Sequence, residues 1–334
     1  MTASTSSSGP LEPIDPFEPI DPFPLESTAQ LMNQINAQLG SRLSRMAPRG
    51  PRSPGHRETA AGARSAEAGT AEAAPTLVAV AHGSRDPAAL RTVTALLDLV
   101  RELRPGLDVR LGHIELEQPL LTGTLASLAS AAASAPAAST PSAPSGSRRS
   151  AVLVPLLLGS GYHVKQDIPQ AAAGFPELAI RVAEPLGPHP LLVETLYARL
   201  VEAGWTADDT RGSGVVLAAA GSRDPESTAA ARRTAALLGE RLGGVPVLPA
   251  YASAATPTVP AAVRTLTARG RRRVAIASYF TAPGRFASQT AAAGSWIAAA
   301  PLGAHPAMAR LLLHRYDQAR AVPLTAARSQ LATA

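Results

Sequence analysis

Short apolar runs of strand length alternate with longer stretches of helical spacing over most of the chain after residue 75. The first run, Leu77 to Ala81, is continuous and rich in β-branched residues, as is typical of a strand buried on both faces of a sheet. It breaks at His82 into a polar turn with a glycine, and apolar positions from Ala88 to Arg104 then recur at helical spacing. A strand, a sharp turn and a helix are therefore predicted in that order.

The same alternation continues to about residue 316. It predicts further strands over 107–116, 151–158, 178–183, 214–220, 245–251, 274–280 and 296–299. It predicts further helices over 119–133, 188–203, 225–242, 257–269 and 306–316, and one from about 286 to 295. The glycine-rich stretch 159–169 is expected to be a turn. Strands that alternate with helices indicate right-handed βαβ units and parallel sheets.

Two motifs occur twice. Gly83-Ser-Arg-Asp-Pro87 recurs 138 residues later as Gly221-Ser-Arg-Asp-Pro225, and Leu186-Gly-Pro-His-Pro190 recurs 116 residues later as Leu302-Gly-Ala-His-Pro306. The difference between these spacings is close to the length of an Ala/Ser/Pro-rich run at 131–150. We therefore expect an α/β protein of two Rossmann-like lobes with parallel sheets, produced by internal duplication, with a cleft between them.

The predicted lobes cover residues 76–204, with a flexible insertion at 131–150, and residues 212–320. Residues 1–75 are predicted to be a disordered tail, because the segment is rich in proline, serine and threonine. Residues 321–334 are also predicted to be a disordered tail. Within it, residues 30–45 have the spacing of one amphipathic helix, which is either transient or docks a partner. No apolar run is long enough for a membrane span, and no secretory signal is apparent, so we predict a cytoplasmic protein.

Charge and composition restrict the chemistry. The sequence has no cysteine, so any metal must be held by His, Asp, Glu or the substrate. The net charge is +6, and Lys165 is the only lysine. A basic globular part favours anionic partners. Because aromatic residues make up only 4% of the chain and are not interleaved with basic ones, a small polycarboxylate is favoured over nucleic acid.

Two histidines follow predicted strands and lie in glycine-bearing turns. His82 follows the first strand and His163 follows the third, so parallel topology predicts that they meet at one sheet edge. A single histidine in a turn is more often structural. In the second half, however, Ala220 and Phe286 occupy the equivalent places, so both histidines are absent together while the Gly-Ser-Arg-Asp-Pro frame remains. This joint loss favours one functional half and one scaffolding half.

Glu115, near the end of the predicted second strand, should reach the same edge. A carboxylate beside two neutral imidazoles suits a metal ligand or a proton acceptor, although an exposed strand-end acid is an equally good interpretation. Glu117 is the less favoured neighbour.

Four basic residues are predicted to face the cleft and to bind substrate carboxylates. They are Arg85, Lys165, Arg223 and Arg285. In both Gly-Ser-Arg-Asp-Pro frames a structural role is favoured instead, with the aspartate capping the helix and the arginine bracing the turn.

Other candidates are assigned structural roles. His189 and His305 each precede a proline at a predicted helix start. Ser84 and Ser222 lie in no Gly-x-Ser-x-Gly elbow, and no Gly-x-x-x-x-Gly-Lys-Ser/Thr phosphate loop occurs, which disfavours nucleophilic and nucleotide chemistry.

Four stretches together carry a resemblance. They are 77–87 (LVAVAHGSRDP), 114–119 (IELEQP), 161–169 (GYHVKQDIP) and 186–190 (LGPHP). They resemble the sirohydrochlorin/cobalt chelatase family of class II chelatases over about residues 76–320. Gln118 departs from the Glu that is common before this proline, and the Ala/Ser/Pro insertion is unusual.

The resemblance implies a lyase that inserts a divalent metal into sirohydrochlorin or a related tetrapyrrole without ATP, in siroheme or cobalamin biosynthesis. It also implies that His82, His163 and Glu115 are catalytic and that both histidines bind the metal. Fe²⁺, Co²⁺ or Ni²⁺ would be a substrate, since imidazoles hold these ions without the tight grip of thiolates. The alternatives are a non-catalytic tetrapyrrole or metal carrier and, more distantly, a nucleotide enzyme. A monomer is favoured.

Overall fold

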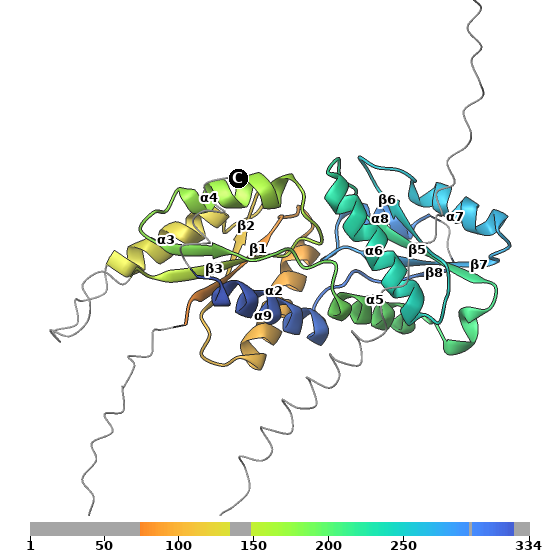
Figure 1. Cartoon of the computed structure of the whole chain (residues 1–334), viewed down its shortest axis with the longest axis horizontal. Coiled ribbons are helices and arrows are strands. Elements are labelled where there is room, and N and C mark those ends of the chain that lie inside the picture. Colours follow the sequence, from red (N-terminus) through yellow and green to blue (C-terminus); the bar gives the residue numbers. More distant parts are fainter. Residues whose placement is uncertain (1–73, 134–147, 294–295, 324–334) are drawn as a thin grey trace, which may run out of the picture. The chain divides into compact units, whose positions relative to one another are not determined.

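The computed structural model describes residues 74–133, 148–293 and 296–323. All but residues 74 and 75 of the predicted amino-terminal tail, including its predicted amphipathic helix, and most of the predicted insertion and carboxyl-terminal tail lie outside these residues. Two four-stranded parallel sheets form the two lobes (Figure 1). In lobe 1 the order is β2-β1-β3-β4, formed by β1 (Thr76–Ala81), β2 (Val109–His113), β3 (Ser150–Pro155) and β4 (Ala179–Val182).

Lobe 2 repeats this arrangement. Its order is β6-β5-β7-β8, formed by β5 (Ser213–Ala219), β6 (Val247–Tyr251), β7 (Arg273–Tyr279) and β8 (Ile297–Ala298). The central strand of each sheet is followed by a helix of 17 residues, α2 (Pro87–Leu103) in lobe 1 and α6 (Pro225–Arg241) in lobe 2. The α/β class, the parallel sheets and the duplication predicted from the sequence are thereby confirmed.

The remaining helices cover both faces of the sheets. They are α3 (Leu121–Ala133), α4 (Ile168–Ala173), α5 (Pro190–Glu202), α7 (Val259–Ala268), α8 (Arg285–Ala291) and α9 (Pro306–Ala321), with a π-helix η1 (His163–Asp167) and a 3₁₀ helix η2 (Ala207–Thr210). The stretch expected to be a turn at 159–169 therefore contains the helical segment η1 and the start of α4. Helix α9 continues past the predicted end of the lobe at residue 320.

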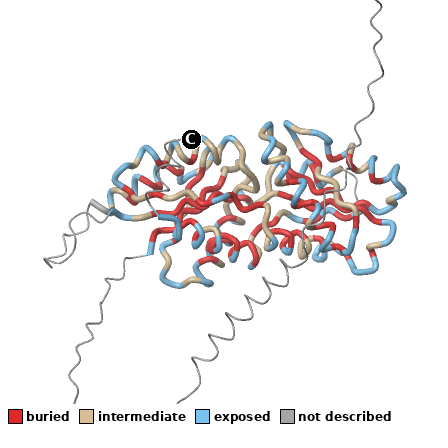
Figure 2. The backbone as a smooth tube through the Cα atoms, in the orientation of Figure 1, coloured by how far each residue is buried: buried red, intermediate tan, exposed pale blue. Residues whose placement is uncertain are grey.

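Two helices are exchanged between the lobes, which the sequence did not predict. Helix α5 follows the strands of lobe 1 but packs on α6 and β7 of lobe 2, whereas α9 follows lobe 2 and packs on α2, β3 and β4 of lobe 1 (Figure 1). The two helices also pack on each other. Their buried leucines, such as Leu192 and Leu312, join the inner faces of both sheets in one core. Figure 2 shows in red the buried stretches of backbone that run through both lobes. The exchange ties the lobes together through apolar burial.

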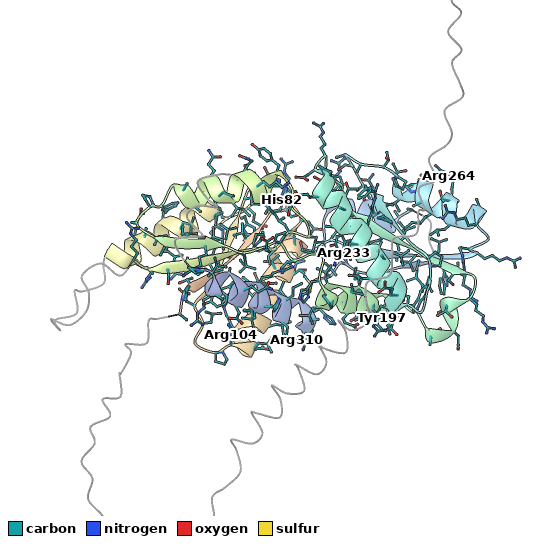
Figure 3. The ribbon with its side chains drawn as sticks, in the orientation of Figure 1. His82, Arg104, Tyr197, Arg233, Arg264 and Arg310 are labelled. Atoms are coloured by element: carbon teal, nitrogen blue, oxygen red, sulfur yellow. The ribbon has the colours of Figure 1, made fainter. Side chains whose placement is uncertain are left out.

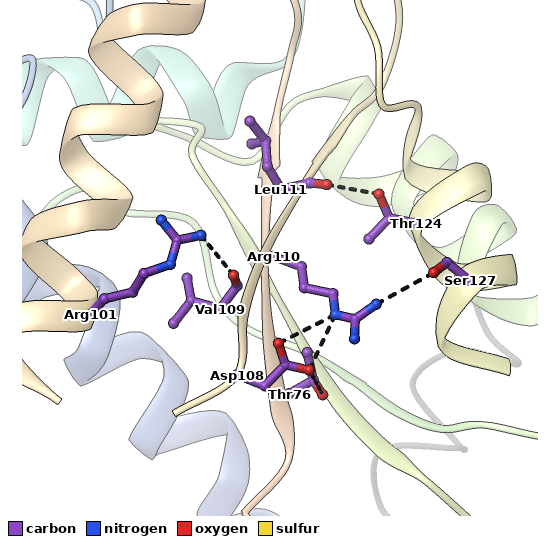
Figure 4. Close-up of polar contacts among 8 residues, drawn as sticks. All are labelled: Thr76, Arg101, Asp108, Val109, Arg110, Leu111, Thr124 and Ser127. Atoms are coloured by element: carbon purple, nitrogen blue, oxygen red, sulfur yellow. Dashed lines mark hydrogen bonds and ion pairs between the residues drawn. The ribbon is translucent and has the colours of Figure 1, made fainter. Parts of the chain in front are cut away.

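The edge strand β2 is held to the helices on both sides of it. Arg101 of α2 donates to the Val109 carbonyl at 2.8 Å, and Thr124 of α3 donates to the Leu111 carbonyl at 2.7 Å (Figure 4). Asp108 accepts hydrogen bonds from Thr76 and Arg110 at the start of the strand (Figure 4). Because these bonds satisfy carbonyls on an unpaired edge, they fix the strand whose far end leads to Glu115.

Candidate active site

A hydrogen-bonded frame shapes the turn after β1. The Ser84 Oγ accepts a hydrogen bond from the Asp86 amide at 3.1 Å, and the Asp86 carboxylate caps α2 by accepting from the Ala88 amide at 2.8 Å. Gly83 has a φ of +99°, and a Cβ there would lie 1.8 Å from the carbonyl oxygen of Glu115. The glycine is therefore required both by its backbone conformation and by the close approach of the β2–α3 loop.

Lobe 2 contains the same frame. Ser222 and Asp224 make the equivalent hydrogen bonds at 3.0 and 2.9 Å. Gly221 has a φ of +94°, and a Cβ there would lie 1.8 Å from the Ser253 carbonyl oxygen. The predicted helix caps are confirmed in both lobes. The frame is thus a structural device, and the residue placed before its glycine, His82 in lobe 1 and Ala220 in lobe 2, is free to vary.

The structure brings His82, His163 and Glu115 together. The ring centroids of the two histidines are 4.6 Å apart and their planes are almost perpendicular, at 85°. The His82 Nδ1 lies 3.7 Å from a Glu115 carboxylate oxygen. Their side chains are 43% and 51% exposed, and that of His163 is 33% exposed, so the group is open to a ligand. Figure 3 shows His82 at the end of lobe 1 that faces lobe 2.

A fourth residue, Asp167, joins this group and was missed in the sequence. Its carboxylate contacts the His163 Nδ1 at 2.5 Å, four residues further along η1. The signal for it was the His-x-x-x-Asp spacing, which places two side chains on one helix face. That spacing had no meaning while the segment was expected to be an irregular turn.

Each imidazole therefore has its Nδ1 turned to a carboxylate. Neither Nε2 makes a hydrogen bond within the residues that the structure describes. A carboxylate on one ring nitrogen orients the ring and strengthens the other nitrogen as a ligand. The arrangement suits two neutral imidazoles that present Nε2 to a metal ion or accept protons there.

Among the described residues no three histidine, aspartate or glutamate side chains converge as a complete metal site. Two imidazoles with one nearby carboxylate leave most of an ion's coordination positions open. Such a group can hold a divalent ion while other ligands approach it.

Lobe 2 carries no such group at the equivalent place. Ala220 and Phe286 stand there, and Phe286 is partly exposed. The loops that follow the strands nevertheless approach each other across the lobes: a Cβ at Gly161 would lie 3.7 Å from the Ser222 Oγ, and one at Gly284 would lie 3.6 Å from the Ser84 Oγ. The carboxyl ends of both sheets thus meet where the histidines lie.

Lys165 is engaged by lobe 2. Its Nζ lies 2.7 Å from Asp224 and 3.0 Å from Glu226, and these contacts raise the pKa of the lysine. Hydrogen bonding to Lys165 likewise lowers the pKa of Asp224. Since two carboxylates compensate its charge, the geometry does not favour the predicted role of Lys165 in binding substrate carboxylates.

The three predicted arginines are available to a ligand. Arg85, Arg223 and Arg285 are exposed, and none makes a hydrogen bond or ion pair with another described residue. The alternative in which the arginines of the two frames brace their turns is therefore not seen in the described part of the chain.

The other histidines have structural surroundings. His189 and His305 cap α5 and α9, each Nδ1 accepting from a backbone amide at 3.1 Å, which agrees with the structural roles predicted for them. Burial lowers the pKa of His189 to about 4. His113 is buried, and its Nδ1 lies 3.2 Å from the Pro119 carbonyl oxygen. Its Nε2 lies 3.9 Å from Glu117, so Glu117 contacts His113 and is not one of the carboxylates beside His82 and His163.

Comparison with known proteins is consistent with this geometry. Residues 76–203 and 214–319 each match the family model described as CbiX. The chain is 28% identical over 183 residues to the sirohydrochlorin ferrochelatase of Bacillus subtilis, a match that spans 53% of this chain and 63% of that relative's length. It is 23% identical over 138 residues to the sirohydrochlorin cobaltochelatase of Methanococcoides burtonii, covering 38% of this chain and 94% of that one.

A solved structure shares the fold. The sirohydrochlorin chelatase SirB from Bacillus subtilis subspecies spizizenii, in complex with cobalt, superposes with a TM-score of 0.58 at 20% identity, covering 76% of this chain and 98% of that one. At this identity the likeness concerns the fold alone. Within the residues that the structure describes, no helix is both long and apolar enough to cross a membrane.

Proposed function

Because the chain belongs to the CbiX family, we propose that it is a sirohydrochlorin chelatase, a lyase that inserts Fe²⁺ or Co²⁺ into the macrocycle without a nucleotide. The observation that carries the proposal is the pair of imidazoles, His82 and His163, with ring centroids 4.6 Å apart and a carboxylate at each Nδ1. The product would serve siroheme or cobalamin biosynthesis. A single chain supplies both imidazoles and both carboxylates of the proposed site.

The metal is a substrate in this reaction. The Nε2 atoms of His82 and His163 replace part of the hydration shell of the incoming ion. Imidazole suits Fe²⁺, Co²⁺ and Ni²⁺, and the absence of thiolates from the sequence leaves the ion free to transfer to the macrocycle nitrogens. The partial coordination that two imidazoles provide is therefore an advantage for transfer.

Insertion also releases protons. The macrocycle loses two pyrrole N–H protons as M²⁺ binds its four nitrogens, so two protons leave for each metal inserted. Once the metal has departed, His82 and His163 each accept one of the two protons at Nε2, and the imidazolium ions are stabilised at Nδ1 by Glu115 and Asp167 respectively. Each imidazolium then returns its proton to water, which restores the neutral ring for the next metal ion.

The rim of the site fits a flat, anionic macrocycle. Leu116 and Tyr162, the neighbours of Glu115 and His163 in sequence, have 53% and 69% of their surface exposed. We assign them contact with the faces of the macrocycle. The exposed Arg85, Arg223 and Arg285 are assigned to its acetate and propionate groups.

The test is metal insertion by the purified full chain. Sirohydrochlorin is mixed anaerobically with Fe²⁺, Co²⁺ or Ni²⁺ and a substoichiometric amount of protein, and the absorption spectrum is followed over time. We expect several macrocycles to be metallated per chain, and we expect His82→Ala and His163→Ala each to lower the initial rate at least about 100-fold. Arg264→Ala, a change in α7 of lobe 2, serves as control.

Three results would reject the proposal or the site on which it rests. A rate equal to that without protein excludes catalysis, and stoichiometric binding without turnover identifies a carrier. Retained rates in both histidine variants, with circular dichroism showing an intact fold, would remove the site from the reaction.

A further inference from the structure

A pocket of about 390 Å³ lies between the lobes, beside the β4–α5 connection. One wall is the face of α6 that carries Glu226 and Arg233, and Arg315 of α9 forms another. Ser160, from the loop that leads to His163, lines it as well. Figure 3 labels Arg233 on α6. The pocket therefore adjoins the candidate active site without including either of its paired histidines.

The duplication provides an internal comparison for Arg315. Its counterpart in α5, 116 residues earlier, is Arg199. Arg199 donates through Nε and Nη2 to the Leu302 carbonyl at 3.1 and 2.9 Å, and its Nη1 forms an ion pair with Glu202 at 2.6 Å. All three of its guanidinium nitrogens are thus engaged, and its charge is compensated.

Arg315 keeps the same position but lacks these partners. Its Nη2 lies 3.5 Å from the equivalent carbonyl, of Leu186, and its Nη1 bonds the neutral side chain of Gln318, which stands where α5 has Glu202. Its Nε is buried and has no hydrogen-bond partner. A buried guanidinium nitrogen without an acceptor costs free energy, which a ligand oxygen would recover.

The second arginine of the pocket, Arg233 of lobe 2, has no arginine at the equivalent position of lobe 1. Arg233 is exposed and makes no ion pair with a described residue, and its counterpart in α2 of lobe 1 is Ala95. Two carboxylates line the pocket too. Glu226 shares Lys165, at 3.0 Å, with Asp224. The exposed Glu184 interacts with Arg315 through its charge without a contact within 4 Å. The two guanidinium groups are the donors left open.

We propose that this pocket is a carboxylate-binding subsite in which Arg233 and Arg315 hold one carboxylate group of a bound ligand. Arginine pairs with carboxylates through parallel N–H···O bonds, and the volume accommodates an acetate or propionate arm. Because Ser160 belongs to the loop before His163, the favoured source is a peripheral carboxylate of the macrocycle, an assignment that rests on the proposed function. A free small carboxylate offers the same chemistry.

Three variants of the full chain test the subsite, and two probe ligands separate the two sources of the carboxylate. Arg233→Ala removes one donor. Gln318→Glu supplies the carboxylate that Glu202 provides to Arg199, so it should occupy Arg315 without removing any packing. Arg232→Ala is the matched control, because it is the exposed neighbour on α6 and does not line the pocket. The dissociation constant of metal-free sirohydrochlorin is measured by its absorption change, and that of citrate by titration calorimetry.

We expect Arg233→Ala and Gln318→Glu each to weaken binding of sirohydrochlorin about ten-fold, the effect of one lost charge-assisted bond, with Arg232→Ala unchanged. Weakening of citrate alone would identify a free carboxylate as the ligand and would still support the subsite. Unchanged binding of both probes in both variants, or no binding of either probe to the unmodified chain, would overturn it. Because no metal is present, failure of insertion in the separate assay would reject the proposed function and leave this result standing.

Discussion

The contact between Asp167 and His163 gives a demanding test of the proposed chemistry. Asp167→Asn keeps the size of the side chain and an acceptor oxygen for Nδ1–H, but it removes the negative charge 2.5 Å from the ring. If the ring becomes an imidazolium during insertion, the charge matters most in that step. A neutral amide would leave metal binding by the neutral ring largely intact.

The size of the effect follows from the geometry. A hydrogen bond to a charged group contributes about 1.5–3 kcal/mol, and exposures of 33% and 30% for the two side chains reduce it through solvent screening. With about 1.4 kcal/mol for each factor of ten, a loss of about 1.4–2 kcal/mol lowers kcat about 10- to 30-fold. This matches the general cost of removing a group that orients a metal-binding histidine.

The assay is metal insertion followed by absorption, at saturating metal and macrocycle. Asp98→Asn is the control, because it removes the same charge from an exposed carboxylate of α2 that pairs with Arg101 outside the site. A kcat within two-fold of the unmodified chain for Asp167→Asn would show that the carboxylate only holds η1 in place, and the proton-accepting role of His163 would have to be abandoned.

Three further outcomes are expected. Gly83→Ala should lower the free energy of unfolding by about 3 kcal/mol, because the added Cβ would lie 1.8 Å from a carbonyl oxygen. Gly106 has a similar φ but open space around it, so Gly106→Ala should lower the free energy of unfolding by only about 1 to 2 kcal/mol. Equal losses of the two variants in urea titrations would contradict this reasoning. The folded-state pKa of His189, about 4, lies below the unfolded value of 6.5, so its contribution is complete above pH 6.5 and is lost as the pH falls towards 4. Discounted for partial exposure, about 1–3 kcal/mol should disappear over that range, and His189→Asn, which retains a cap, should flatten the unfolding profile; an unchanged slope would refute the assignment. Leu116→Ala should raise KM for the macrocycle about five-fold with no loss of stability, because an alanine, Ala254, has a similar positive φ at the equivalent place in lobe 2. An unaltered KM would remove Leu116 from the rim.

The elements that the sequence predicted well are those with strong local signals. Continuous apolar runs predicted every strand of both sheets to within a few residues, and the repeated Gly-Ser-Arg-Asp-Pro frame predicted the duplication. The pairing of His82 with His163 followed from topology, since β1 and β3 are adjacent parallel strands. Periodicity and strand adjacency were sufficient for these features.

Features that depend on tertiary packing between distant parts of the chain could not be predicted from the sequence. The exchange of α5 and α9 leaves each helix with the same apolar pattern it would need on its own lobe, so no periodicity reveals it. The segment that forms η1 was predicted to be a turn because it is flanked by Gly159, Gly161 and Pro169, and Asp167 was therefore not recognised as a partner of His163. The partners of Lys165 lie about sixty residues away in the other lobe, and no local pattern relates them.

The retained frame of lobe 2 has a function of its own in this arrangement. In lobe 1, Asp86 caps its helix and the frame presents His82. In lobe 2, Asp224 caps α6 in the same way, and its second oxygen binds Lys165, two residues after His163. Ser227 adds a hydrogen bond to the Ser160 carbonyl at 3.0 Å, on the other side of that histidine. The loop that carries His163 is therefore fastened at two points to the start of α6. Without a histidine at position 220, the duplicated turn holds the loop of lobe 1 that carries His163, which gives the frame a structural reason to persist where the imidazole does not.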